Sequence, residues 1–472
     1  MRSLIIFTIL LYCTAGAGFA QSGRLNPPSA DVPTVETRAE LSAEQLFDEV
    51  SAYIKTKFTE FNQKKIPYDE KLRVQTVQEQ KQLAAKNAAI LLARNNLAGE
   101  DFYFLGRLHW FAENVDGADE NFRKYLAAEK SVAERAQTAR SVVIVISARR
   151  KSFDEAEKLL VEYLNNNPVN PGERLDMESE LAKFYREEKN FAKAAAHAEE
   201  AYRAAKVLFS KASRTRGLND LYDTGLKTFE IYRDDRQIEK ADKALDDLQK
   251  TGALVESTTI YYVAVNERIK YLIETGRKPL AMQFYKESLE QAVKDFKLKS
   301  WQDDILSRLK RREKHYQMLG LPAPELTDVD RWFPGEAKQL AELRGKVVLL
   351  DFWATWCGPC IQTFPSLTQW NQNFEKDGLV ILGVTRYYGK SVSAEVKNDA
   401  MEIEFLQKFK KENNLAYDFV VGKNMTNQII YDATNLPTTV IIDRKGIIRY
   451  AETGAGREKN IQKTIEKLLA EK

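Results

Sequence analysis

The sequence predicts a multidomain protein in which an all-α helical-repeat region is followed by an α/β domain. Three observations support this prediction. The chain has 472 residues, which is more than one ordinary hydrophobic core accommodates. From residue 39 to residue 319, helix-favouring residues dominate and prolines are rare, as expected for a helical region. From residue 320 onwards, apolar runs of strand length alternate with helical segments, which is typical of α/β domains.

The charge balance excludes one class of function. The chain has 71 basic and 68 acidic residues and a formal net charge of +3. A nucleic-acid-binding domain carries a clear excess of positive charge, and a basic membrane patch needs clustered Lys and Arg. We therefore expect no nucleic acid among the partners, and we interpret the mixed charges as solvated helix faces.

Residues 1–20 have the pattern of a signal peptide. Arg2 precedes an apolar run that ends at Tyr12, and small residues follow up to Ala20. The run is too short to span a bilayer comfortably, and small residues favour cleavage after Ala20. We predict an exported protein, periplasmic or otherwise extracytoplasmic. An uncleaved segment that anchors the chain in the membrane is the alternative, whereas lipidation at Cys13 fits poorly because the bulky Tyr12 precedes it.

Residues 21–38 are expected to form a linker, because they contain Gln21-Ser22-Gly23 followed by Pro27, Pro28 and Pro33. The helical region that follows, residues 39–319, contains small residues at a fixed spacing.

Ala118, Ala156 and Ala194 are 38 residues apart, and Gly106 and Ala182 each lie 12 residues before one of them. This pattern resembles the tetratricopeptide repeat, in which small residues lie where two helices cross. The resemblance implies a stack of helix pairs whose concave face binds a peptide or protein. A helical bundle with accidental spacing is the alternative.

Residues 320–472 predict one α/β domain, which begins at the Gly320–Pro324 segment. Its first strand is a continuous apolar run, typical of a strand buried on both faces. Strands are expected at 346–352, 379–384, 418–421, 438–443 and 447–451, and helices at 360–374, 401–412 and 458–471.

Two cysteines, Cys357 and Cys360, would remain after removal of a signal peptide. A bridge between them closes almost no loop and therefore adds little stability, which points to chemistry instead. The first cysteine would begin a helix directly after a buried strand, and the positive end of a helix dipole stabilises a thiolate. We expect Cys357 to be the exposed nucleophile that attacks disulfides and Cys360 to be the buried cysteine that resolves the mixed disulfide.

Asp351 lies at the end region of the strand expected at 346–352, just before these cysteines. Burial would raise the pKa of its carboxyl group, and a pKa near neutrality suits a proton shuttle for Cys360. The alternative for Asp351 is a solvated strand end.

The segment Trp356-Cys357-Gly358-Pro359-Cys360 resembles the signature of thioredoxin. Asp351 falls where the thioredoxin family has a buried carboxylate, Trp353 falls on a family tryptophan, and Pro365 falls on the proline that kinks the active-site helix. The segment Leu436-Pro437-Thr438-Thr439 resembles the family loop that carries a cis proline beside the cysteines. The resemblance implies a thioredoxin-like domain.

The resemblance also implies roles for individual residues. Cys357 and Cys360 would form a redox disulfide, and Pro437 would follow a cis peptide bond. The residues expected to contact the substrate are Trp356, Gly358, Pro359, Leu436 and Pro437. The stretches 323–326 and 343–346 resemble the exported TlpA/ResA branch of the family, related to the redoxin and AhpC/TSA proteins, whose members are usually disulfide reductases outside the cytoplasm.

The chain departs from the family pattern between its second strand and the proline loop. This segment is longer than thioredoxin needs and includes Tyr387-Tyr388-Gly389 and the helix expected at 401–412. It suggests an inserted element that shapes access to the site. Arg386 and Tyr387 either flank the site or are ordinary surface residues. Leu436 stands where relatives often have a small or β-branched residue, which leaves partner choice open.

We expect neither a metal ion nor a cofactor. A zinc site needs four ligands, but there is no second cysteine pair, and the three histidines, His109, His197 and His315, lie in the helical region. Ile361 follows Cys360, where c-type haem attachment requires histidine.

The predicted function is thiol–disulfide oxidoreduction, specifically the reduction of oxidised exported proteins with electrons from a membrane donor. A thiol peroxidase is one alternative, because peroxiredoxins share the fold. Their peroxidatic cysteine follows a Pro-x-x-x-Thr-x-x-Cys pattern, whereas Phe352 to Thr355 contain no proline. The other alternative is a helical-repeat scaffold that binds a peptide or protein and has a secondary redox role.

Overall fold

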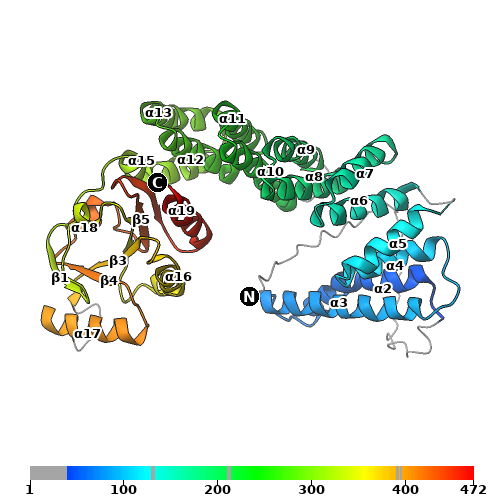
Figure 1. Cartoon of the computed structure of the whole chain (residues 1–472), viewed down its shortest axis with the longest axis horizontal. Coiled ribbons are helices and arrows are strands. Elements are labelled where there is room, and N and C mark those ends of the chain that lie inside the picture. Colours follow the sequence, from blue (N-terminus) through cyan, green and yellow to red (C-terminus); the bar gives the residue numbers. More distant parts are fainter. Residues whose placement is uncertain (1–39, 129–132, 210–213, 390–392, 394–395, 472) are drawn as a thin grey trace. The chain divides into compact units, whose positions relative to one another are not determined.

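The fold is taken from a computed structural model that describes residues 40–128, 133–209, 214–389, 393 and 396–471. The predicted signal peptide (1–20), Cys13 and the predicted linker (21–38) lie outside the described residues. The chain divides into two compact units, residues 1–143 and 144–472, and Figure 1 follows the elements of each in chain order. No helix among the residues covered by the structure is both long and apolar enough to cross a membrane.

Helices make up the described part of the first unit. Gly106 lies where two of them meet, because a Cβ atom there would approach the Phe122 ring to 2.8 Å. Ala118 is fully buried at the same helix pair. The helices are α2 (Ala43–Gln63), α3 (Glu70–Leu92), α4 (Glu100–Phe111) and α5 (Val115–Leu126), followed by α6 (Ala133–Arg149), which crosses into the second unit.

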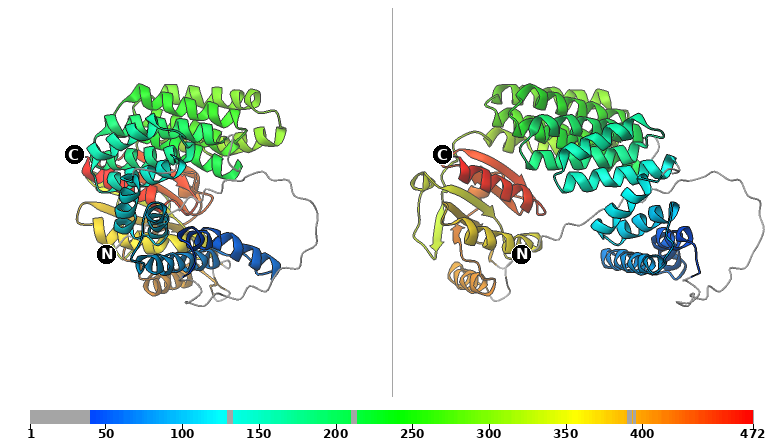
Figure 2. Two further views of the ribbon diagram at one scale, coloured as in Figure 1. Left: turned by 90° about the vertical axis from the view of Figure 1, so that its right-hand side faces the viewer. Right: turned by 45° about the vertical axis from the view of Figure 1, so that its right-hand side comes forward.

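The second unit begins with further helices, in which each helix packs on the next along most of the array, as the two views in Figure 2 show. Ala156, Ala182 and Ala194 have no exposed surface, as expected for small residues at helix crossings. The tetratricopeptide assignment itself stays a prediction. The helices are α7 (Phe153–Asn165), α8 (Pro171–Glu187), α9 (Phe191–Phe209), α10 (Arg214–Asp234), α11 (Ile238–Leu254), α12 (Thr258–Glu274), α13 (Lys278–Asp295), α14 (Lys299–Arg311) and α15 (Glu313–Met318).

A six-stranded mixed sheet follows, with the order β1-β4-β3-β2-β5-β6. Strands β2, β3 and β4 are parallel, while β1, β5 and β6 pair antiparallel with their neighbours. The strands are β1 (Val329–Phe333), β2 (Val347–Phe352), β3 (Leu379–Arg386), β4 (Asp418–Gly422), β5 (Thr438–Ile442) and β6 (Ile448–Thr453). The helices of this part are α16 (Gly358–Phe374), α17 (Asp399–Glu412), α18 (Thr426–Ile430) and α19 (Glu458–Ala470), with a short 3₁₀ helix at Leu340–Leu343.

The predicted strands and helices of this part are present within a few residues of their expected bounds. Strand β1 and helix α18 were not predicted. Strand β1 is a short edge strand that pairs only with β4, and none of its residues is fully buried. Its sequence therefore lacks the apolar run by which the central strands were predicted.

Two apolar clusters cover the two faces of the sheet. The first joins Leu349 of β2 to Phe364 and Trp370 of α16 and to Ile465 of α19. Helices α16 and α19 lie on one side of the sheet in Figure 1.

The second cluster joins Leu350 of β2 and Val440 of β5 to Tyr316 of α15 and to Tyr261 of α12. This cluster is one continuous core that includes side chains from both sides of residue 320. The same junction contains backbone hydrogen bonds between residues 320–323 and residues 446–448.

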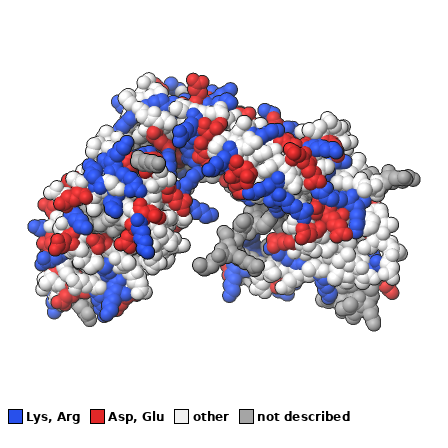
Figure 3. All heavy atoms as spheres, viewed as in Figure 1, with Lys and Arg blue, Asp and Glu red and all other residues white. Residues whose placement is uncertain are grey.

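Basic and acidic side chains are interspersed over the face drawn in Figure 3, on the helices and around the sheet alike. This distribution agrees with the interpretation of the charged residues as solvated faces.

Candidate active site

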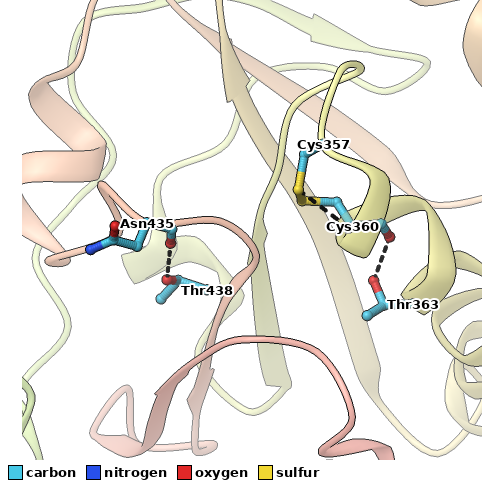
Figure 4. Close-up of a disulfide and its surroundings, with 5 residues drawn as sticks. All are labelled: Cys357, Cys360, Thr363, Asn435 and Thr438. Carbon is cyan, nitrogen blue, oxygen red and sulfur yellow. Dashed lines mark hydrogen bonds between the residues drawn. A yellow bond between two sulfur atoms is a disulfide. The ribbon is translucent and has the colours of Figure 1, made fainter. Parts of the chain in front are cut away.

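A disulfide joins Cys357 and Cys360 where β2 gives way to α16 (Figure 4). Cys357 is the N-cap residue of α16, and its Sγ accepts a hydrogen bond from the Cys360 backbone amide at 3.3 Å. The first turn of a helix carries unpaired amides and partial positive charge. Reduction of this disulfide would therefore leave the Cys357 sulfur at a position that stabilises a thiolate.

Both cysteines are largely covered by protein. Cys357 is 5% exposed and Cys360 is fully buried. Cys357 is thus the more accessible cysteine, but it is less exposed than we expected, because its side chain belongs to the apolar cluster that includes Trp353 and Phe364. The exposed groups around it are Trp356, of which 54% is exposed, and Gly358 and Pro359.

Helix α16 contains Pro365 in its interior, at the position expected from the resemblance to thioredoxin. The Thr363 hydroxyl donates a hydrogen bond to the Cys360 carbonyl at 2.7 Å, as drawn in Figure 4. Both features lie one or two turns beyond the cysteines and belong to the scaffold of the helix.

The peptide bond between Leu436 and Pro437 is cis, as predicted from the resemblance. The loop is held by Thr438, whose hydroxyl donates to the Asn435 carbonyl at 2.6 Å. Thr438 pairs with Phe352 in the antiparallel ladder between β5 and β2. The ladder thus brings the proline loop to the end of β2 from which the cysteine segment departs.

Asp351 is 1% exposed and has Gly383 and Thr439 as its cross-strand neighbours. Burial raises the pKa of its carboxyl group from the ordinary value of 3.8 to about 7. Its Oδ2 has no hydrogen-bond partner among the residues that the structure describes. The side chain is therefore a buried carboxyl that exchanges its proton near neutral pH, and the alternative of a solvated strand end does not apply.

Two further polar side chains lie near Gly383, the neighbour of Asp351 on β3. A Cβ atom on Gly383 would lie 3.0 Å from Trp353 Nε1 and 3.2 Å from the Tyr417 ring. Burial, and secondarily the charge of Asp351, raise the pKa of the Tyr417 hydroxyl well above its usual value. Tyr417 was not identified from the sequence, because a lone tyrosine before an apolar strand does not indicate that its side chain lies near Asp351.

The loop after β3 lies beside the exposed tryptophan. The Tyr388 ring meets the Trp356 ring edge to face, with 5.4 Å between the ring centroids. The Arg386 guanidinium lies 4.1 Å from the Tyr388 ring centroid. Arg386 is therefore near the site, whereas Tyr387 turns its hydroxyl to Asp330 on β1. The sequence singled out the segment but not the contact of Tyr388 with Trp356.

The three histidines lie on three different helices, α4, α9 and α15. His109 contacts Asn114 at 3.0 Å, and His197 contacts Glu178 at 2.6 Å. His315 is buried, and its ring lies 3.8 Å from Asp432. Within the described ranges, His, Cys, Asp and Glu side chains form no group of three or more that could hold a metal ion.

Comparisons with known proteins place the resemblance in the C-terminal third of the chain. Residues 319–451 match the family model described as the AhpC/TSA family. The thiol-disulfide oxidoreductase ResA of Geobacillus kaustophilus is 28% identical over 33% of this chain and 81% of its own length. The thioredoxin-like protein YneN of Bacillus subtilis is 28% identical over 28% of this chain and 71% of its own.

Among solved structures, a thiol:disulfide interchange protein DsbE described as putative, from Chlorobium tepidum, is 25% identical, with a TM-score of 0.27. It covers 32% of this chain and 98% of its own length. The family match and the relatives confirm the predicted resemblance: the C-terminal third is a thioredoxin-like domain, and the chain is an oxidoreductase.

Proposed function

We propose that this protein is an exported disulfide reductase, which uses the Cys357–Cys360 pair to reduce disulfides of extracytoplasmic proteins. One observation carries the proposal: the disulfide caps α16 beside the cis-Pro437 loop, and Asp351 is buried at the end of the adjoining strand. A redox-inert bridge needs neither an amide-lined helix end nor a buried carboxyl with a pKa of about 7.

The first step is attack by the Cys357 thiolate on one sulfur of the client's disulfide. A bond forms between Cys357 Sγ and that sulfur, while the client's second sulfur leaves as a thiolate and takes a proton from solvent. The Cys360 amide, which donates to Cys357 Sγ at 3.3 Å in the disulfide, and the N-terminal dipole of α16 stabilise the attacking thiolate. The exposed face of Trp356 and the loop at Leu436 and Pro437 contact the client.

The second step resolves the mixed disulfide. Asp351 takes the proton of the Cys360 thiol, and the resulting thiolate attacks Cys357 Sγ. The client's remaining sulfur leaves as a thiolate and takes a proton from solvent, and Asp351 later releases the Cys360 proton to solvent. The client has then gained two electrons and two protons, and the protein disulfide forms again. A carboxyl with a pKa of about 7 suits this proton transfer at neutral pH.

A further protein must return two electrons to the disulfide. Outside the cytoplasm we expect a membrane electron donor. The Gly358-Pro359 pair matches thioredoxin, for which the potential is about −270 mV, and this favours a reductant over an oxidant.

Trapping tests the proposal. A Cys360→Ala variant expressed in cells should accumulate its clients as mixed disulfides on Cys357, identifiable by mass spectrometry after non-reducing electrophoresis. The matched control is Cys357→Ala, which leaves the fully buried Cys360 and should trap nothing. Equal trapping by both variants, or by neither, would contradict the proposed order of attack.

Export is a separate part of the proposal. It is supported by the signal-peptide pattern and by the resemblance to the TlpA/ResA branch. Fractionation followed by N-terminal sequencing should find a mature chain that begins at Gln21. An intact N-terminus in the membrane fraction would instead support an uncleaved anchor.

For the helical residues 39–319 we propose a tetratricopeptide-like stack that binds a peptide or protein, followed by the thioredoxin-like domain at 320–472. The spacing of the buried alanines supports this assignment. If binding rather than redox chemistry were the main role, a Cys357→Ser variant would keep full biological activity.

A thiol peroxidase is the second candidate, favoured by the match to the AhpC/TSA family. Peroxide consumption by the purified protein with dithiothreitol as the only added thiol would support it. The reductase proposal predicts much slower consumption of peroxide than of protein disulfides.

A further inference from the structure

Residues 387–389, which directly follow β3, are fixed at three points. The Tyr388 and Gly389 amides donate to the two carboxylate oxygens of Glu402 at 2.8 and 2.9 Å. The Tyr387 hydroxyl donates to Asp330 Oδ2 at 2.5 Å. The Tyr387 amide donates to the Gly422 carbonyl of β4 at 3.3 Å. Residues 387–389 are thus tied to β1, β4 and α17.

Glu402 is the least expected of these anchors. It is 1% exposed, although it lies on the inserted helix α17. A buried carboxylate needs hydrogen-bond donors, and both carboxylate oxygens of Glu402 accept hydrogen bonds from these two amides. The inserted helix is thus bound directly to the segment that carries Tyr388.

Tyr388 in turn packs against the residue that precedes Cys357. Its ring packs edge to face against Trp356, which precedes Cys357 and is 54% exposed. Arg386 packs against the Tyr388 ring at 4.1 Å. Trp, Tyr and Arg are the residues that most often dominate binding at protein interfaces, and strand ends of parallel sheets are where ligands bind.

We propose that Tyr388, fixed by Glu402 and in contact with Trp356 and Arg386, selects the disulfides that the site accepts. It favours protein segments with an aromatic residue next to the attacked cysteine, because Trp356 is itself next to Cys357. The proposal rests on the proposed reductase function and names its substrate class. Such a residue adds a third ring to the pair formed by Trp356 and Tyr388. Glu402 acts as a positioning residue, because it holds the loop and does not contact the client.

The test uses three peptide disulfides that are identical except for the residue after the cysteine, which is Phe, Ala or Glu. Reduced wild-type protein should reduce the Phe peptide with a kcat/KM about two- to tenfold higher than the Ala peptide, the range expected of one aromatic pair. The Tyr388→Ala variant should bring this ratio close to one, whereas Tyr388→Phe should keep it. Glu402→Ala should also lower the ratio, and a thermal unfolding curve with a single transition would show that this variant is folded.

Tyr68→Ala is the matched control, because Tyr68 is 63% exposed in the first unit, and it should keep the wild-type ratio. Equal rates for the Phe and Ala peptides with wild-type protein, or an unchanged ratio in Tyr388→Ala, would overturn the proposal. A preference for the Glu peptide would assign selection to the Arg386 charge and would also overturn it. If wild-type protein reduced none of the three peptides, the reductase function itself would fail.

Discussion

Two buried carboxylates lie in one row of the sheet and have opposite surroundings. Asp351 on β2 pairs with Thr439 on β5, and Thr439 pairs with Glu452 on β6. Asp351 is 1% exposed and Glu452 is 5% exposed. Burial raises the pKa of Asp351 to about 7. Burial also acts to raise the pKa of Glu452, but Lys270, Arg312 and Arg457 together lower it below its usual value.

The partners of Glu452 come from both parts of the second unit. Arg312, between α14 and α15, binds both carboxylate oxygens at 2.5 and 2.7 Å. Lys270 of α12 lies 3.5 Å from one oxygen, and Arg457 lies 3.1 Å from the other.

The comparison teaches how one sheet gives similar groups different roles. A buried carboxylate with cations around it stays ionised and connects two structural elements. A buried carboxyl without a cation keeps its proton up to neutral pH and can exchange it. Glu452 attaches the helical array to the sheet, whereas the pKa of Asp351 suits the proton exchange that we propose with Cys360.

The largest expected effect comes from removing a cationic partner of Glu452. Arg312→Met removes the bidentate partner of Glu452 and should lower the free energy of unfolding by about 3–5 kcal/mol, the usual cost of breaking a buried ion pair. Urea unfolding followed by tryptophan fluorescence measures it. Lys299→Met is the control, because the Lys299–Asp303 pair is exposed, and it should change the free energy by less than about 1 kcal/mol. A similar small loss for Arg312→Met would show that Glu452 is not held as described.

The next prediction concerns Asp351 and the dependence of stability on pH. The Asp351 pKa is about 7 in the folded chain and has a reference value of 3.8. Between pH 4 and 7 the unfolded chain releases the Asp351 proton while the folded chain keeps it, so wild-type stability falls as the pH rises through this window.

The Asp351→Asn variant should not show this loss of stability, because an asparagine side chain does not titrate. The shift of about 3 pKa units corresponds to at most about 4 kcal/mol at about 1.4 kcal/mol per unit. The variant should therefore gain stability over the wild type, by up to that amount at pH 8 and by much less at pH 5, in urea unfolding of the oxidised proteins. A difference that does not depend on pH would mean that Asp351 has an ordinary pKa.

The smallest expected effect tests how tightly side chains pack over Gly383, the neighbour of Asp351 on β3. A Cβ atom on Gly383 would lie 3.0 Å from Trp353 Nε1 and 3.2 Å from Phe419 and Tyr417. Gly383→Ala should cost about 1–3 kcal/mol of stability through overpacking. Gly358→Ala is the stability control, since nothing lies within 4 Å of its Cβ position. If both variants had the same unfolding midpoint, the packing over Gly383 would be looser than described.

The sequence was sufficient to predict those features that depend on a few consecutive residues. The apolar run of β2, the cysteine pair at the start of a helix and the proline before β5 each occupy a few consecutive residues. Asp351 could be assigned a raised pKa because it ends such a run.

Features that depend on distant residues could not be predicted. Glu402 and Tyr388 meet although 14 residues separate them, and Arg312 meets Glu452 across 140 residues. A charged residue on an amphipathic helix or at its end is usually solvated, so neither Glu402 nor Arg312 gave a signal of burial. The edge strand β1 was not predicted for a related reason. It pairs with β4 on one side and is partly exposed to solvent on the other, so its sequence contains no continuous apolar run.

The central claim is that the Cys357–Cys360 pair exchanges electrons with protein disulfides. The most direct test mixes the reduced protein with insulin and follows alkylation of the peptide that carries both cysteines, by mass spectrometry. The account predicts two alkylated sulfurs before mixing and none afterwards, with a matching gain of two thiols on insulin, and no such exchange in Cys357→Ser. Two alkylated sulfurs that persist while insulin stays oxidised would contradict it.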